Sequence, residues 1–155
     1  MRIRVLAVGT RMPAWVAEGV KEYQKRCPKE WQLSWCEIPV AKRQGASADQ
    51  LMALEAQSIR RQLKASEQIV ALDVRGALVS TEDLAAHITD WQMTGQDTAL
   101  VIGGPEGIAP ELLREARYRW SLGKITLPHP LVRVLLTEQL YRAWSINAQH
   151  PYHRG

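Results

Sequence analysis

Short apolar runs alternate with longer amphipathic segments along this chain, and this alternation constrains its fold more than any other feature. Runs with the composition of strands cover residues 3–8, 33–38, 68–74, 98–102 and 125–127. Apolar positions recur at helical spacing in residues 13–25, 47–63, 80–95, a short stretch behind Pro110, and residues 130–148. Strands that alternate with helices predict a parallel sheet with helices on both faces, so the expected class is α/β.

The length and apolar content of the chain indicate one folded domain over residues 1–155. A chain of 155 residues, 46% of them hydrophobic, can bury a core without metal or disulfide support. No apolar run approaches the roughly 18 residues that a membrane span requires. Residues 1–9 alternate like a strand rather than a secretory signal, so we expect a cytoplasmic protein without membrane contact.

The two cysteines carry no functional signal. Cys27 and Cys36 have neither the spacing of a redox dithiol nor that of zinc ligands. In a cytoplasmic compartment we expect two reduced thiols, although the sequence leaves a disulfide between them open. No metal site is expected.

Positive charge is concentrated at the two ends of the chain. Residues 1–44 carry nine Lys and Arg against four acids, and residues 117–155 carry six against one, whereas residues 45–116 carry five against eleven. Such segregation favours a polyanionic partner, and solvation of helix faces is an equally simple explanation. Aromatic residues among the C-terminal charges favour RNA.

Two segments rich in glycine and proline, residues 100–107 and 120–133, suggest a ligand site built from main chain. In each, an apolar run ends abruptly, so backbone donors and acceptors outside the sheet can converge on a ligand. Residues 103–107 lack the spacing of a dinucleotide fingerprint and the Lys-Ser/Thr pair of a P-loop, and Glu106 would repel a phosphate. An ordinary tight turn is the alternative for this loop.

The terminal helix has more apolar positions than one helical stripe accommodates. One face would contact the sheet, and the second would contact another subunit in a twofold dimer. A wholly internal helix in a monomer is the alternative.

Four blocks of the sequence resemble the bacterial large-subunit ribosomal RNA methyltransferase H family, which belongs to the SPOUT class. They are residues 103–107, 127–133, 138–144 and 151–153. The resemblance extends over essentially all 155 residues and includes residues 8–10, Lys42 with Arg43, and Leu72-Asp73 with Gly76. The combination of blocks is specific, whereas any one alone is weak.

This resemblance implies a homodimer whose C-terminal part forms a trefoil knot, a rare exception among folds. It also implies S-adenosyl-L-methionine as methyl donor, and methylation of N3 of a pseudouridine in 23S ribosomal RNA on assembled ribosomes. Carried over by position, the donor-binding residues are Leu72, Gly103, Leu122, Gly123, Lys124, Ile125, Thr126 and Leu127. Relatives often have serine at the position of Gly123, so a hydroxyl contact is missing here.

The pseudouridine N3 carries a weakly acidic proton, and a positioned base or cation would assist its removal. Residues 122–127 form the donor segment. His129, between two prolines just after it, is the first candidate, and the start of the terminal helix is its alternative role. His153 and Tyr152 in the tail, residues 149–155, are rivals that could stack on an extruded base. The resemblance implies that the partner subunit's tail completes the site.

Five basic residues are candidate RNA contacts. Arg142 lies one helical turn after Glu138, so an i,i+4 ion pair is its alternative. We expect Arg133 and Arg154 to contact RNA directly, and Lys42 and Arg43 to contact phosphates.

The sequence leaves two other classes of function to consider. A noncatalytic ribosome- or RNA-binding protein with the same fold is the main alternative. An NAD-linked oxidoreductase is disfavoured because the glycine fingerprint and the ribose-binding acid do not occur in the required context.

Overall fold

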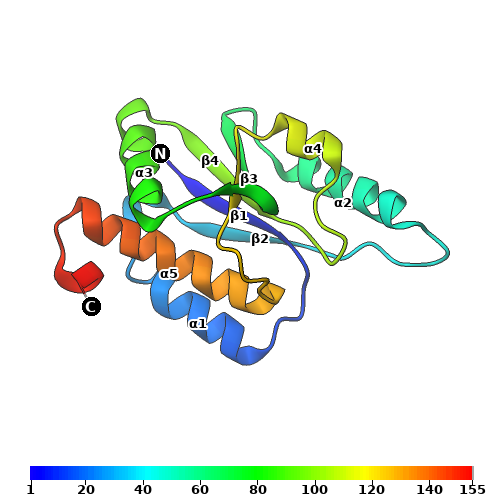
Figure 1. Ribbon diagram of the computed structural model, residues 1–155, viewed down its shortest axis with the longest axis horizontal. Helices are drawn as coiled ribbons and strands as arrows, with labels where there is room; N and C mark the ends of the chain where they lie inside the picture. Colours follow the sequence, from blue (N-terminus) through cyan, green and yellow to red (C-terminus); the bar gives the residue numbers. More distant parts are fainter. Residues whose placement is uncertain (155) are drawn as a thin grey trace.

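A single parallel sheet forms the centre of the computed structural model, which describes residues 1–154 (Figure 1). Its strands stand in the order β2-β1-β4-β3-β5, and every neighbouring pair is parallel. The strands are β1 (Ile3–Val8), β2 (Ser34–Ile38), β3 (Glu67–Leu78), β4 (Asp97–Ile102) and β5 (Tyr118–Ser121). Gly155, the last residue of the expected tail, lies outside the described residues.

Helices cover both faces of this sheet, which confirms the expected α/β class. Figure 1 shows α1, α3 and α5 on one face and α2 and α4 on the other. Their bounds are α1 (Ala14–Gln24), α2 (Ala48–Gln62), α3 (Thr81–Thr94), α4 (Pro110–Glu115) and α5 (His129–Asn147), with short 3-10 helices η1 (Lys29–Trp31) and η2 (Pro151–Arg154). The trefoil knot stays a prediction.

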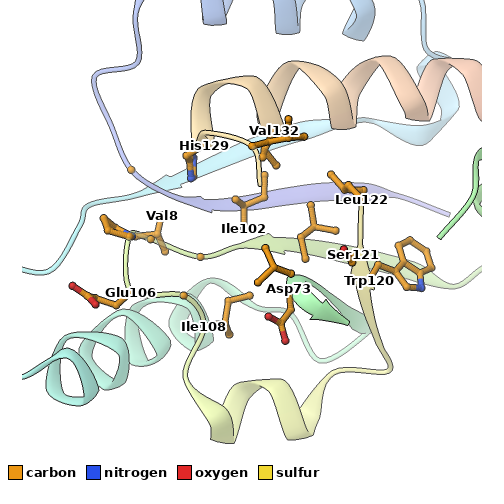
Figure 2. A pocket seen from close by; sticks show the side chains of 18 of the residues that line it. Val8, Asp73, Ile102, Glu106, Ile108, Trp120, Ser121, Leu122, His129 and Val132 are labelled. Carbon is orange, nitrogen blue, oxygen red and sulfur yellow. The ribbon is translucent and has the colours of Figure 1, made fainter. Parts of the chain in front are cut away.

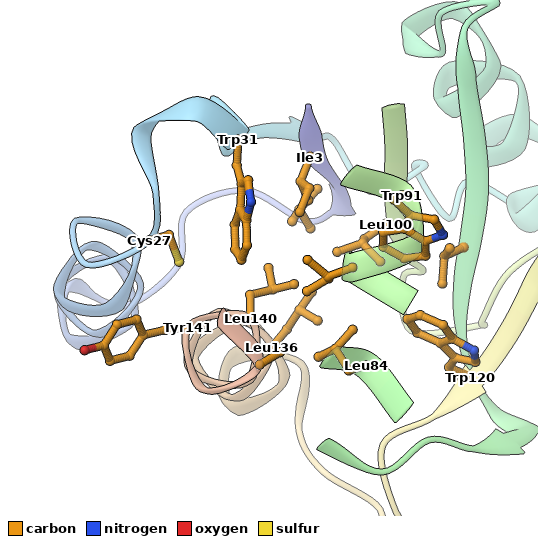
Figure 3. Packing of buried hydrophobic residues seen from close by; sticks show 14 of the residues in the cluster. Ile3, Cys27, Trp31, Leu84, Trp91, Leu100, Trp120, Leu136, Leu140 and Tyr141 are labelled. Atoms are coloured by element: carbon orange, nitrogen blue, oxygen red, sulfur yellow. The ribbon is translucent and has the colours of Figure 1, made fainter. Parts of the chain in front are cut away.

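The central strands are apolar throughout because both of their faces are buried. In β1, Ile3 and Val5 contribute to the core beneath α1, α3 and α5, whereas Leu6 and Val8 contribute to the core beneath α2 and α4. Figure 3 shows the first core, where Leu136 and Leu140 of α5 approach the sheet. Burial on both faces is the general reason why parallel strands lack polar alternation.

The fifth strand was predicted at residues 125–127, and that prediction is wrong. The strand comprises Tyr118–Ser121, and residues 125–127 form an irregular segment. Trp120 is buried and stacks on Trp91 with ring centroids 6.0 Å apart, whereas the side chain of Ile125 is 78% exposed. The prediction relied on apolar composition, which placed the strand at the wrong residues. The observed strand shows instead the alternation typical of strands, with Trp120 buried and Arg119 exposed.

The terminal helix is confirmed, and it uses its apolar sides largely within the chain. α5 packs against both α1 and α3. The approach to α1 is close, since a Cβ on Gly19 would lie 3.1 Å from Val134. Much of the apolar excess that suggested a dimer is thus absorbed by two helices of the same subunit, although Leu131 stays exposed.

Strand β3 makes an excursion at its carboxyl end that bears on the site. Leu72 and Ala77 are both in register with Trp120, so residues 73–76 leave the regular pairing with β5. Gly76 permits the return, because a Cβ there would lie 2.6 Å from the carbonyl carbon and oxygen of Arg119. The excursion places residues 73–75 at the edge of the cavity described next.

Candidate functional site

A cavity of about 890 Å³ opens at the carboxyl ends of the parallel strands. Its walls are the carboxyl ends of four strands with the residues that follow them, namely residues 8–10 at the end of β1, 72–75 at the end of the regular part of β3, 102–108 at the end of β4 and 120–123 at the end of β5. Figure 2 shows that the labelled side chains are mostly apolar, with His129 near the start of α5. Ligands of open parallel sheets bind at this position, because chain segments separate there to leave a crevice.

The cavity brings together most of the residues proposed for donor binding. Its lining includes Leu72, Gly103, Leu122, Gly123, Ile125 and Leu127. Lys124 and Thr126 instead line an adjoining cavity of about 240 Å³, which shares Gly123 and Ile125 with the first. All eight predicted positions therefore lie around one continuous region of the surface.

The glycine-rich loop after β4 is a tight turn that also forms a wall of the cavity. The amide of Gly107 donates a 3.0 Å hydrogen bond to the carbonyl of Gly104, and Gly107 has φ +91°. Gly103 is held so closely that a Cβ would lie 2.7 Å from Ile108. The two readings of this loop, tight turn and ligand wall, are thus compatible.

The segment after β5 leaves its main chain available to a ligand. Ser121 donates a 2.8 Å hydrogen bond from Oγ to the carbonyl of Gly123, which turns the chain away from the sheet. Within residues 1–154, the amides of Leu122 and residues 124–127 donate no hydrogen bond to protein. Donors that are outside both sheet and helix, at a cavity, are suited to recognise a flat polar ligand.

His129 is the first residue of α5, and one nitrogen of its ring is engaged. Its Nε2 accepts a 2.8 Å hydrogen bond from Nε of Arg133. Burial and then the Arg133 cation lower the pKa of the imidazole, against smaller opposing effects of Gly103 and Glu37. The ring is neutral at pH 7, yet the lone pair that a base needs is already used by Arg133.

Arg133 lies inside the protein, which corrects the expectation that it contacts RNA. The residue is only 3% exposed. Its guanidinium also donates to Glu37 at 2.5 Å and to the carbonyl of Gly9 at 2.7 Å. Arg133 therefore ties the start of α5 to β2 and to the end of β1, next to the cavity.

The tail folds back along α5, from its carboxyl end to its middle, away from the cavity. At 1.5 Å per residue, the tail's partners Glu138 and Ser145 lie about 14 and 24 Å along α5 from His129. Tyr152 donates a 3.1 Å hydrogen bond to Glu138 and packs on Tyr141, and His153 lies 3.3 Å from Oγ of Ser145. Neither tail residue lines the cavity of its own chain.

The surroundings of Tyr152 hold its phenol in the neutral form. Burial, followed by the charge of Glu138, raises the pKa of Tyr152 to about 12. Arg142 lies over the Tyr152 ring, 4.8 Å from its centroid, and makes the expected i,i+4 ion pair with Glu138 at 3.1 Å. Arg154, at the end of η2, is exposed.

The basic loop, which we define as residues 39–46, adjoins the glycine-rich loop through two acids. Exposed Lys42 and Arg43 lie on it, and Arg43 forms an ion pair with Glu106 of the cavity wall. Glu55 of α2 is buried, and its Oε2 accepts a 3.0 Å hydrogen bond from the amide of Ala41. Sequence reasoning did not assign Glu55 a role, although an acid on the inward stripe of a helix was the available signal.

Residues 1–154 contain neither a cluster of potential metal ligands nor a helix that could span a membrane. No group of three or more potential ligands is placed to hold a metal ion in that range. In the same part of the chain, every helix is too short or too polar to cross a membrane. Both cysteines are free, and burial raises the pKa of Cys27 to about 12.

Comparison with known proteins assigns the chain to a family. The family model described as "Predicted SPOUT methyltransferase" matches residues 1–153. The chain is 51% identical to the ribosomal RNA large subunit methyltransferase H of Chromohalobacter salexigens, over 99% of this chain and 100% of that protein. Proteins of the same name from Hahella chejuensis and Ectopseudomonas mendocina are each 48% identical, over 99% of this chain and 99% and 100% of theirs.

A solved structure supports the same fold. A probable methylase family protein from Haemophilus influenzae superposes with a TM-score of 0.56 at 16% identity, over 97% of this chain and 67% of that one. At that identity the likeness concerns the fold alone. The match of the family model over nearly the whole chain, together with relatives about half identical over their full length, shows that this chain belongs to the SPOUT methyltransferases.

Proposed function

We propose that this protein transfers a methyl group from S-adenosyl-L-methionine to N3 of a pseudouridine in 23S ribosomal RNA, on assembled ribosomes. The names of the relatives support an RNA of the large ribosomal subunit as substrate. The single observation that carries the donor assignment is the set of free amides at Leu122 and residues 124–127 beside a mostly apolar cavity.

The cavity suits an adenosine better than it suits a phosphate ligand. An adenine is held by main-chain hydrogen bonds and apolar contacts, and Leu122, Ile125 and Leu127 supply both. Glu106 and Asp73 make the lining unfavourable for phosphate groups. Lys124 and Thr126 complete the donor segment from the adjoining cavity.

Methyl transfer requires alignment rather than covalent chemistry by the protein. When bound, S-adenosylmethionine supplies a methyl group on a sulfonium sulfur. The walls of the cavity exclude water and fix the line from the attacking N3 through carbon to sulfur, which provides much of the rate. As the N–C bond forms, the C–S bond breaks, and the N3 proton passes to a base.

The base comes from a second copy of the chain. His129 is poorly placed for this role because its Nε2 already accepts from Arg133. Tyr152 and His153 are held against Glu138 and Ser145, about 14 and 24 Å along α5 from His129 at 1.5 Å per residue, and neither lines the cavity of its own subunit, so another subunit delivers them to it. His153 of that subunit accepts the N3 proton, and Tyr152 stacks on the base.

A homodimer is supported by exposed apolar residues on the paired helices α1 and α5. Trp15 of α1 is 49% exposed and Leu131 of α5 is 43% exposed. Large apolar side chains left in water on two packed helices favour burial against an equivalent surface. The knot implied by the family would hold the donor segment between the two subunits.

The basic side chains that remain exposed bind the RNA. Lys42 and Arg43 lie on the basic loop near the cavity, and Arg154 extends from the tail. Arg142, by contrast, is engaged by Glu138 and Tyr152 and positions the tail. A ribosomal substrate places the protein in the cytoplasm.

The decisive experiment is transfer of labelled methyl groups to ribosomes that lack the modification, followed by mapping of the labelled nucleotide. Label at N3 of a 23S pseudouridine is expected. Calorimetric titration with S-adenosylmethionine separates the alternative, since ribosome binding without saturable donor binding would indicate a noncatalytic protein.

A further inference from the structure

Asp73 is a nearly buried carboxylate in the cavity wall, and although Leu72-Asp73 with Gly76 is part of the family resemblance, the resemblance assigns Asp73 no role. Its side chain is 12% exposed. The strand register fixes the position of Asp73. The preceding residue, Leu72, is the last residue of β3 that pairs with β4, where it lies opposite Ile102, and on the other side it lies opposite Trp120 of β5. Asp73 therefore follows β3 at the point where the glycine-rich loop and the donor segment both leave the sheet.

The carboxylate lacks a strong partner of its own. Its Oδ1 accepts from the amide of Arg75 at 3.3 Å and lies 3.9 Å from Nε of the same residue, whose side chain is largely exposed. Both distances are long for a charged hydrogen bond, which is usually about 2.7–2.9 Å. Two carboxylate oxygens with about four lone-pair sites are thus available at the cavity.

The backbone holds this carboxylate in place. Residues 73–76 form the excursion of β3, and Gly76 contacts the backbone of Arg119 and Trp120 so closely that any Cβ would overlap it. An excursion fixed at Leu72 and at Gly76 has little freedom to move. Asp73 is accordingly presented by rigid main chain, as a residue that recognises a ligand must be.

We propose that Asp73 binds the two ribose hydroxyls of the donor's adenosine, an inference that rests on the proposed function. The donor segment begins directly after β5, next to Leu72, so the sugar of an adenosine held there lies close to Asp73. Vicinal hydroxyls can donate one hydrogen bond to each oxygen of a single carboxylate. Figure 2 shows Asp73 on the side of the view away from His129, which lies at the opposite end of the lining.

The other acid of the wall is less suited to this role. Glu106 is already paired with Arg43 of the basic loop. A contact of Asp73 with the donor's sulfonium would weaken the donor alone in a variant, because the sulfonium is lost on methyl transfer whereas the ribose is common to donor and product. A contact with the ammonium, which the product keeps, would weaken both ligands and would weaken their deoxy analogues just as much, which would overturn the ribose assignment.

The test is calorimetric titration of Asp73→Asn with S-adenosylmethionine, S-adenosylhomocysteine and their 2′-deoxy and 3′-deoxy analogues. Asparagine keeps one acceptor oxygen, so the variant loses one hydrogen bond to a ribose hydroxyl and the charge that strengthens the other, which is expected to weaken donor and product equally, by about 10- to 100-fold. For the deoxy analogues, which lack one of the hydroxyls that Asp73 would bind, the substitution is expected to reduce affinity much less than it does for the parent ligands. Asp90→Asn, at an exposed position of α3, is the matched control, and circular dichroism verifies the fold of both variants.

Each other outcome overturns a specific statement. Weaker binding of the donor alone would assign Asp73 to the sulfonium instead of the ribose. Unchanged binding of both ligands would remove Asp73 from the site, while leaving the proposed function intact. Absence of saturable binding by the unchanged protein would overturn the proposed function and this inference together.

Discussion

Arg133 donates a hydrogen bond from Nε to Nε2 of His129, 2.8 Å away and one helical turn earlier. The same guanidinium reaches Glu37 and the carbonyl of Gly9. One buried cation thus joins the ends of two strands to the first turn of α5, and it occupies the lone pair of the histidine nearest to the cavity. The residue that sequence assigned to RNA is a support of the site.

Replacing Arg133 by methionine should therefore lower stability. The variant keeps most of the side-chain volume but loses charged hydrogen bonds, each of which contributes about 1.5–3 kcal/mol. Urea unfolding should give a lower midpoint with an unchanged slope. Arg114→Met, at an exposed site of α4, is the control and should differ little from the unchanged protein. Equal midpoints for R133M and R114M would contradict the buried network.

Stability should also depend on pH through His129. Its folded pKa is depressed below the unfolded value of about 6.5, so the unfolded chain binds the proton more readily. The resulting stabilisation is complete above pH about 6.5 and is lost as the pH falls through the folded pKa. His129→Gln should reduce the drop in unfolding free energy between pH 7.5 and 5. A drop as large in the variant as in the unchanged protein would assign the titration to another group.

The shared site predicts complementation between two inactive variants. Leu122→Arg places a cation in the donor cavity, and His153→Gln removes the proposed base from the tail. If each site combines a cavity with another subunit's tail, random mixing of the two variants should restore about one quarter of the activity, because half of the dimers carry one intact site.

Activity that stays at the level of the separate variants would show that each subunit works alone. Mixing either variant with itself is the matched control. Donor binding by His153→Gln should remain normal, because the proposed role of His153 is to accept the N3 proton and not to hold the donor.

The basic loop should contribute unequally to ribosome binding. Lys42 is exposed, whereas Arg43 must leave Glu106 before it contacts a phosphate. In a plot of log affinity against log salt concentration, Lys42→Ala should reduce the slope by about 0.7–0.9, the contribution of one phosphate contact, and Arg43→Ala by less. Binding is measured by filter retention at several salt concentrations, with Arg114→Ala as control. A double variant with the unchanged slope would exclude the loop from the RNA interface.

The sheet and the position of the site were largely predictable because their signals are local. Four strands and the main helices follow from spacing that is visible within a few residues, and the cavity lies at the carboxyl ends of parallel strands, as such folds require. The fifth strand was missed because Tyr118–Ser121 has only four residues and includes the charged Arg119, so it lacks the apolar composition on which the prediction relied. The donor-binding residues were predicted from the resemblance to the methyltransferase family, because no periodicity in the sequence reveals which main-chain amides stay unpaired.

By itself, the sequence determined the α/β class, the end of the sheet that holds the site, and the lack of reactive side chains in the donor segment, because each depends on residue type and short-range order. Only the tertiary structure decided that Arg133 is buried, that Asp73 lines the cavity, and that the tail packs on α5 outside the donor site of its own chain. Those facts depend on partners such as Gly9, Glu37 and Trp120, which are distant along the chain and become neighbours only when the helices and strands pack.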